Sequence, residues 1–143
     1  MRTNILGIPF DVLTPGEAVD RGFQLMGSGG GRVVTPNPEI VMVCRKNPEA
    51  REAVVTADLI LADGIGILKA AKSLGRPLQS RVLGVEWTFS MLARCAETGK
   101  TVFFLGGKPG VAALAAEKAA ERFPNLTVLG VCDGYFTDDE EVV

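Results

Sequence analysis

A short apolar run that ends at an aspartate–glycine pair is the feature that most constrains this chain. Residues 59–62 are apolar and too few for a helix, so they predict one buried strand. The next pair, Asp63-Gly64, breaks regular structure and places a carboxylate just beyond that strand. In open α/β sheets, ligands bind beyond the carboxyl ends of strands. Asp63 is therefore either a functional carboxylate, with Gly64 leaving room for a ligand, or a turn aspartate bonded to its own backbone.

Strand and helix patterns alternate along the rest of the chain. Further strands are predicted over residues 32–35, 101–105 and 126–131, and residues 4–12 predict a short edge strand or hairpin. Helices are predicted over residues 15–26, from residue 38 onward, and over residues 48–56, 67–74, 85–98 and 111–123. The first of these helices is expected to bury Ala18, Phe23 or Leu25, and Met26. This alternation indicates an α/β, Rossmann-like fold with a mainly parallel sheet flanked by helices. We expect residues 1–143 to form a single domain.

Composition removes several classes of function. The 143 residues include no histidine, which excludes histidine bases and histidine-ligated metal sites. The net charge of −2 lacks the cationic surface of a nucleic-acid-binding protein. No apolar stretch approaches the roughly 20 residues of a membrane span, and no signal peptide is evident, so we expect a cytoplasmic protein. The three cysteines predict buried, reduced thiols rather than a disulfide framework.

A glycine-rich turn follows the apolar strand at residues 101–105. It contains Gly106, Gly107 and Lys108, and a predicted helix begins directly after it. In a strand–turn–helix of this kind, free backbone N–H groups and the positive helix end attract phosphate. The spacing differs from the dinucleotide fingerprint, which disfavours a nicotinamide dehydrogenase.

Other polar residues also follow predicted strands. Thr35 and Asn37 come after the strand at residues 32–35; Asn37 is also a good helix N-cap, and so is Asn47, which joins helix to helix. Arg81 is either a surface charge or a phosphate partner. Tyr135 either stacks on a base or packs in the core. Because parallel strands end at one edge of a sheet, we expect Thr35 and Asn37 to converge at that edge with Asp63 and the glycine turn.

Taken together, these motifs resemble the WecG/TagA/CpsF family of bacterial glycosyltransferases in order and spacing over nearly the whole chain. The motifs are Thr35-Pro36-Asn37-Pro38-Glu39, Ala57-Asp58 with Asp63-Gly64-Ile65-Gly66, Arg81-Val82-Leu83-Gly84, Phe103 to Gly110, and Gly134-Tyr135-Phe136. The resemblance implies inverting transfer of an N-acetylmannosamine-type sugar from a UDP-sugar to undecaprenyl-diphosphate-linked N-acetylglucosamine, without metal or cofactor.

The resemblance also implies roles for individual residues. It makes Asp63 the general base and Thr35, Asn37 and Arg81 active-site residues, with Tyr135 beside the nucleotide. The expected substrate-binding residues are Gly64, Gly106, Gly107, Lys108, Gly134 and Tyr135.

Members of this family continue beyond the position of Val143, through a further strand and helix to a basic tail that meets the membrane. We therefore expect this chain to lack part of the family region, and with it the peripheral contact with the inner face of the membrane. Self-association is also implied. The alternative hypothesis is a noncatalytic nucleotide-binding α/β module that needs a partner.

Overall fold

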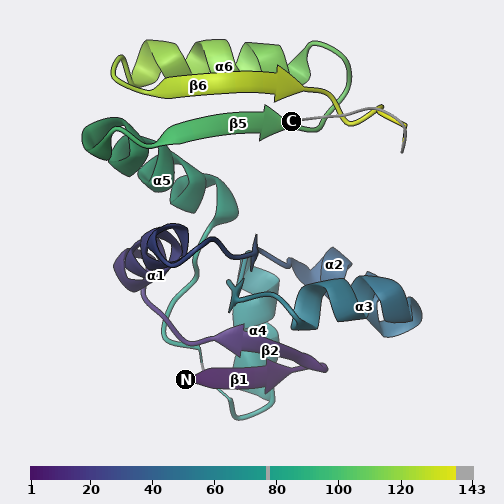
Figure 1. Ribbon diagram of the computed structural model, residues 1–143. Coiled ribbons are helices and arrows are strands. Elements are labelled where there is room, and N and C mark those ends of the chain that lie inside the picture. Colours follow the sequence, from purple (N-terminus) through teal and green to yellow (C-terminus); the bar gives the residue numbers. More distant parts are fainter. Residues whose placement is uncertain (77, 138–143) are drawn as a thin grey trace. The chain divides into compact units, whose positions relative to one another are not determined.

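The computed structural model describes residues 1–76 and 78–137, and its strands and helices alternate as predicted (Figure 1). The elements in chain order are β1 (Arg2–Ile5), β2 (Ile8–Asp11), α1 (Pro15–Gly27), β3 (Val33–Val34), α2 (Pro38–Lys46), α3 (Pro48–Val55), β4 (Leu59–Ile60), α4 (Ile65–Ser73), α5 (Gly84–Thr98), β5 (Thr101–Leu105), α6 (Val111–Arg122) and β6 (Thr127–Cys132). The α/β class is therefore confirmed. The chain divides into two compact units, Met1–Thr88 and Phe89–Val143, which are described separately.

Strand pairing follows the predicted pattern in the described residues. In the first unit, β1 and β2 form the antiparallel N-terminal hairpin, and β3 pairs with β4 in parallel. In the second unit, β5 pairs with β6 in parallel, and α6 lies along the two strands (Figure 1). Each of these sheets has two strands.

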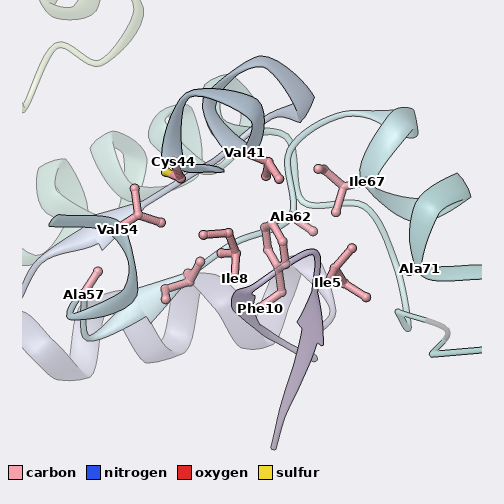
Figure 2. Close-up of a cluster of buried hydrophobic side chains, with 11 residues drawn as sticks. Ile5, Ile8, Phe10, Val41, Cys44, Val54, Ala57, Ala62, Ile67 and Ala71 are labelled. Atoms are coloured by element: carbon pink, nitrogen blue, oxygen red, sulfur yellow. The ribbon is translucent and has the colours of Figure 1, made fainter. Parts of the chain in front are cut away.

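Residues 59–62 are buried along their whole length, as predicted, and the first two of them form β4. Ile60 and Ala62 pack into one apolar cluster with the hairpin, where Figure 2 shows Ile5, Phe10 and Ile67 gathered around Ala62. Leu59 and Leu61 pack into a second cluster that includes Ala18 and Leu25 of α1. Successive side chains of a strand point to opposite faces, so this run is covered on both sides.

Asp11 ties the hairpin to β4. Its Oδ2 accepts a hydrogen bond from the Ile60 N–H at 2.8 Å, and its Oδ1 accepts one from Arg2 Nε at 3.0 Å. The same arginine donates to the carbonyls of Ala57 and Asp58, at 3.1 and 2.8 Å. These contacts fix the point at which β4 begins.

Helix α1 begins with the capping box expected from its sequence. The Glu17 N–H donates to Thr14 Oγ1 at 3.3 Å, and the Thr14 N–H donates back to Glu17 Oε2 at 2.8 Å. The Thr14 backbone and then its hydroxyl lower the pKa of Glu17 from its usual 4.5. The box is therefore present at neutral pH and is lost as the pH falls through that lowered pKa.

The expected burial of Met26 is wrong, because its side chain is 37% exposed. Ala18 and Leu25 are seven positions apart and share one face of α1. Each helical residue turns about 100°, so the residue after Leu25 leaves that face.

The second unit has its own apolar core. It consists of residues from α5, α6 and the loop before β6, packed against the strands: Leu92, Cys95, Ala119 and Leu126, with Val102, Phe104 and Val128. The thiols of Cys44, Cys95 and Cys132 are free, and the first two are buried, as predicted. The expected burial of Cys132 is wrong, because at the end of β6 it is only half-buried. Burial raises the pKa of the Cys95 thiol, and the positive charge of Lys100 acts in the opposite direction by lowering it.

No helix in the described part of the chain is long and apolar enough to cross a bilayer.

Truncating Phe10 should destabilise the first unit strongly. Phe10 is fully buried, at 0% exposed, so Phe10→Ala should lower the free energy of unfolding by about 3–5 kcal/mol through lost burial and a residual cavity. Leu74 in the same unit is 48% exposed, and Leu74→Ala should cost roughly 0.5 kcal/mol or less. Urea unfolding followed by circular dichroism measures both. Equal losses for the two variants would contradict the assigned core.

Candidate functional site

Thr35 and Asp63 lie next to each other because they follow paired parallel strands. Val33 and Val34 pair with Leu59 and Ile60. Hydrogen bonds continue beyond the strands, from the Leu61 N–H to the Val34 carbonyl at 2.9 Å and from the Asp63 N–H to the Pro36 carbonyl at 3.4 Å. The two segments therefore leave the sheet together, as expected from the sequence.

The Asp63 carboxylate meets the start of α5. Its Oδ2 accepts a hydrogen bond from the Gly84 N–H at 3.3 Å. A Cβ placed on Gly84 would lie 2.8 Å from Thr35 Oγ1 and 3.2 Å from Asp63 Oδ2. We call Thr35, Asp63 and Gly84 the Asp63 cluster. Asp63 is half-buried, and its carboxylate bonds to a distant segment rather than to its own turn.

Asn37 and Asn47 both cap helices, as predicted. Asn37 Oδ1 accepts from the Ile40 N–H at 2.9 Å at the start of α2, and Asn47 Oδ1 accepts from the Ala50 N–H at 3.0 Å at the start of α3. Each cap uses the amide oxygen, so the amide NH₂ group remains available as a donor. Only Asn37 directly follows a strand, beside Thr35.

The backbone beside Arg81 is hydrogen-bonded to the segment that follows β4. Val82, the neighbour of Arg81, is buried, and the Val82 N–H donates to the Ala62 carbonyl at 3.2 Å. The Arg81 side chain is exposed. The structure therefore brings Arg81 to the same loop region as Asp63 and Gly84.

In the second unit, the turn at residues 106–110 has the predicted strand–turn–helix geometry. Gly106, Gly107 and Gly110 have φ values of +119°, +77° and +87°, a backbone region that glycine adopts without strain. The Gly106 N–H donates to the Cys132 carbonyl at 2.9 Å, so this amide shapes the turn. The Val111 N–H at the start of α6 donates to the Lys108 carbonyl at 3.0 Å, so the Gly107 and Lys108 amides are the candidate donors to an anion.

The loop after β6 lies beside this glycine turn. The Gly134 N–H donates to the Gly107 carbonyl at 2.9 Å, and the Tyr135 N–H donates to Asp133 Oδ1 at 2.8 Å. Tyr135 is 71% exposed, which rules out core packing within this unit as described. The sequence Thr137-Asp138-Asp139-Glu140-Glu141 predicts an acidic helix start, and residues 138–143 lie outside the described residues.

The structure thus forms two groups of predicted site residues. Thr35, Asn37, Asp63 and Arg81 belong to the first unit, and the glycine turn with Tyr135 belongs to the second. Their convergence on one edge stays a prediction. Sequence reasoning missed Gly84 as a partner of Asp63, because no local signal links a glycine at a helix start to a carboxylate 21 residues earlier.

Comparison with known proteins decides the family. The model of the glycosyl transferase WecG/TagA/CpsF family matches residues 3–143. The chain belongs to this family. A similar protein is the N-acetylglucosaminyldiphosphoundecaprenol N-acetyl-beta-D-mannosaminyltransferase of Bacillus spizizenii (strain ATCC 23059 / NRRL B-14472 / W23), which is 39% identical over 113 residues.

That alignment covers 79% of this chain and 44% of the Bacillus protein. The chain thus spans less than half the length of this relative in the WecG/TagA/CpsF family. Membership in the family confirms the resemblance drawn from the motifs. In residues 1–76 and 78–137, no three cysteine, aspartate or glutamate side chains group as metal ligands would, and the expected metal independence stays a prediction.

The two asparagine caps should contribute equally to stability. Asn37→Ala and Asn47→Ala each remove one side-chain acceptor from a helix start, so each should lower the free energy of unfolding by about 1 kcal/mol. Urea unfolding of both variants measures the loss. A loss confined to one variant would contradict the equivalence of the caps.

Proposed function

We propose that this chain transfers an N-acetylmannosamine-type sugar from a UDP-sugar to undecaprenyl-diphosphate-linked N-acetylglucosamine, with inversion and without metal. The observation that carries the proposal is the Asp63 cluster, in which one carboxylate oxygen is held by the Gly84 N–H next to the Thr35 hydroxyl. The sugar and the acceptor are suggested by the name of the Bacillus relative. The UDP donor comes from the family resemblance.

Asp63 acts as the general base in this proposal. Its Oδ1 takes the proton from the acceptor hydroxyl while that oxygen bonds to the anomeric carbon from the face opposite the leaving group. The bond from the anomeric carbon to the diphosphate oxygen breaks, and its electron pair leaves with UDP. The chain has no histidine, so this proton transfer falls naturally to a carboxylate.

The leaving UDP gains negative charge, which fixed donors would stabilise. The amides of Gly107 and Lys108, the Lys108 ammonium and the Arg81 guanidinium provide such donors, with Gly106 and Gly134 shaping the turn. The exposed Tyr135 would stack on the uracil.

On the acceptor side, the Thr35 hydroxyl and the Asn37 NH₂ group would orient sugar hydroxyls or the acetamido group. Gly64, which has a φ of +90° and is the N-cap residue before α4, would let the substrate approach the Asp63 backbone closely.

Asp63→Asn should lower transfer by roughly 10²–10⁴-fold, the range that general-base catalysis contributes. Asparagine keeps an oxygen that can accept from Gly84, so folding and UDP affinity should change little. The measurement is transfer to a soluble lipid-linked N-acetylglucosamine analogue, run on this chain and on one extended past Val143, with UDP binding followed by calorimetry.

Asp58→Asn is the matched control, because Asp58 accepts from the Arg32 N–H outside the Asp63 cluster. It should retain transfer within about twofold. Normal turnover by Asp63→Asn would remove Asp63 from the mechanism.

The paired asparagines separate capping from substrate binding. Aspartate caps a helix as well as asparagine does but lacks the NH₂ donors. Asn37→Asp should therefore lower transfer by roughly tenfold or more, the cost of one lost hydrogen bond to substrate. Asn47→Asp, with the same cap geometry, should leave transfer unchanged; equal losses in both variants would assign Asn37 to capping alone.

A nucleotide-binding module without its own activity is the second candidate. It is favoured by one observation: the glycine turn and the Gly134 loop are complete within the second unit. UDP binding without transfer, both by this chain and by the chain extended past Val143, would select this candidate.

The lipid-linked acceptor also suggests where the enzyme works. We propose peripheral contact with the inner face of the cell membrane through the longer family region, and self-association.

A further inference from the structure

We infer that Gly84 is a positioning residue for Asp63. In this inference its amide N–H holds Asp63 Oδ2, and its lack of a side chain lets the Thr35 hydroxyl approach the same point. Gly84 acts through the carboxylate and does not touch substrate. The inference rests on the proposed function, because it concerns the orientation of the proposed base.

The Gly84 amide needs an acceptor from outside its own helix. Gly84 is the first residue of α5, which runs for 15 residues, and the first N–H groups of a helix have no partner within it. The preceding residue is Leu83, whose carbonyl accepts from the Trp87 N–H at 2.9 Å but whose side chain cannot cap. The Asp63 carboxylate supplies the missing acceptor, and a negative charge is favoured at this end of a helix.

The start of α5 is anchored to the core that holds β4. The Trp87 indole N–H donates to the Ala18 carbonyl at 3.0 Å, and Trp87 packs against the cluster containing Leu59 and Leu61. On the other side of Gly84, the Val82 N–H donates to the Ala62 carbonyl at 3.2 Å. Gly84 and Asp63 are thus held by the same strand, so their contact fixes the carboxylate in orientation.

Space, rather than backbone conformation, requires glycine at this position. Gly84 is not among the glycines with positive φ. A Cβ there would approach Thr35 Oγ1 to 2.8 Å and Asp63 Oδ2 to 3.2 Å, so any side chain pushes the two groups apart. With Oδ2 held by the amide, Oδ1 is the oxygen that faces the acceptor hydroxyl.

Two substitutions at Gly84 test the space and the amide in turn. Gly84→Ala adds a Cβ and keeps the N–H, whereas Gly84→Pro also replaces the N–H with a ring carbon that points at Asp63 Oδ2; proline is otherwise favoured at the first position of a helix. We expect kcat of Gly84→Pro to be at least tenfold below that of Gly84→Ala. The KM for the UDP-sugar and the midpoint of urea unfolding should agree between the two variants. Equal kcat values would overturn the inference.

A measurement that needs no activity tests the contact itself. In protein labelled with ¹⁵N-glycine, Asp63→Asn should shift the Gly84 amide resonance, and Asp58→Asn should leave it in place. An unmoved Gly84 resonance in Asp63→Asn would overturn the positioning role whatever the activity. If Asp63→Asn shifts the resonance but the unsubstituted protein transfers no sugar, the contact stands and the proposed function is refuted.

Discussion

The burial of residues 59–62 between two apolar layers is the constraint on which the site depends. Ile60 and Ala62 face the hairpin cluster, whereas Leu59 and Leu61 face α1. A shift of one residue along the strand would move Asp58 or Asp63 into the buried run, so the cost of burying a charge specifies its register. Full burial of each large side chain is worth about 1.5–3 kcal/mol. The carboxylate that follows the strand therefore leaves the core at one defined position.

The polar groups of the site also contribute to the fold. Asp63 supplies an acceptor to the start of α5, and Asn37 caps α2 with its amide oxygen. Each group keeps unused capacity: the second carboxylate oxygen of Asp63 and the NH₂ group of Asn37. The structural and functional interpretations of these residues are thus compatible, because they use different atoms. The structural contacts hold the atoms that the chemistry needs in fixed directions.

Local chemistry explains what could be predicted from the sequence. The capping box at Thr14, the two Asn-Pro-Glu helix starts and the glycine turn each depend on residues within a few positions of one another. The outline of the fold and most candidate residues followed from such signals. The family resemblance then joined the separate motifs into one expected activity.

The features that could not be predicted depend on contacts between distant segments. Met26 fits a helix that buries its apolar residues, yet the width of the buried face of α1 leaves it exposed. The Gly106 amide is bonded to Cys132 of the neighbouring strand. The role of Gly84 follows only from the meeting of α5 with the end of β4. For Gly106 and Gly84 the deciding partner is far away in the sequence, where spacing carries no signal.

The most direct test of the central claim is an experimental structure of the chain with an unhydrolysed UDP-sugar bound. The account predicts that Asp63 Oδ1 faces the anomeric carbon with room for one hydroxyl between them, while the Gly84 N–H still donates to Oδ2. An anomeric carbon beyond the reach of Asp63 would contradict it.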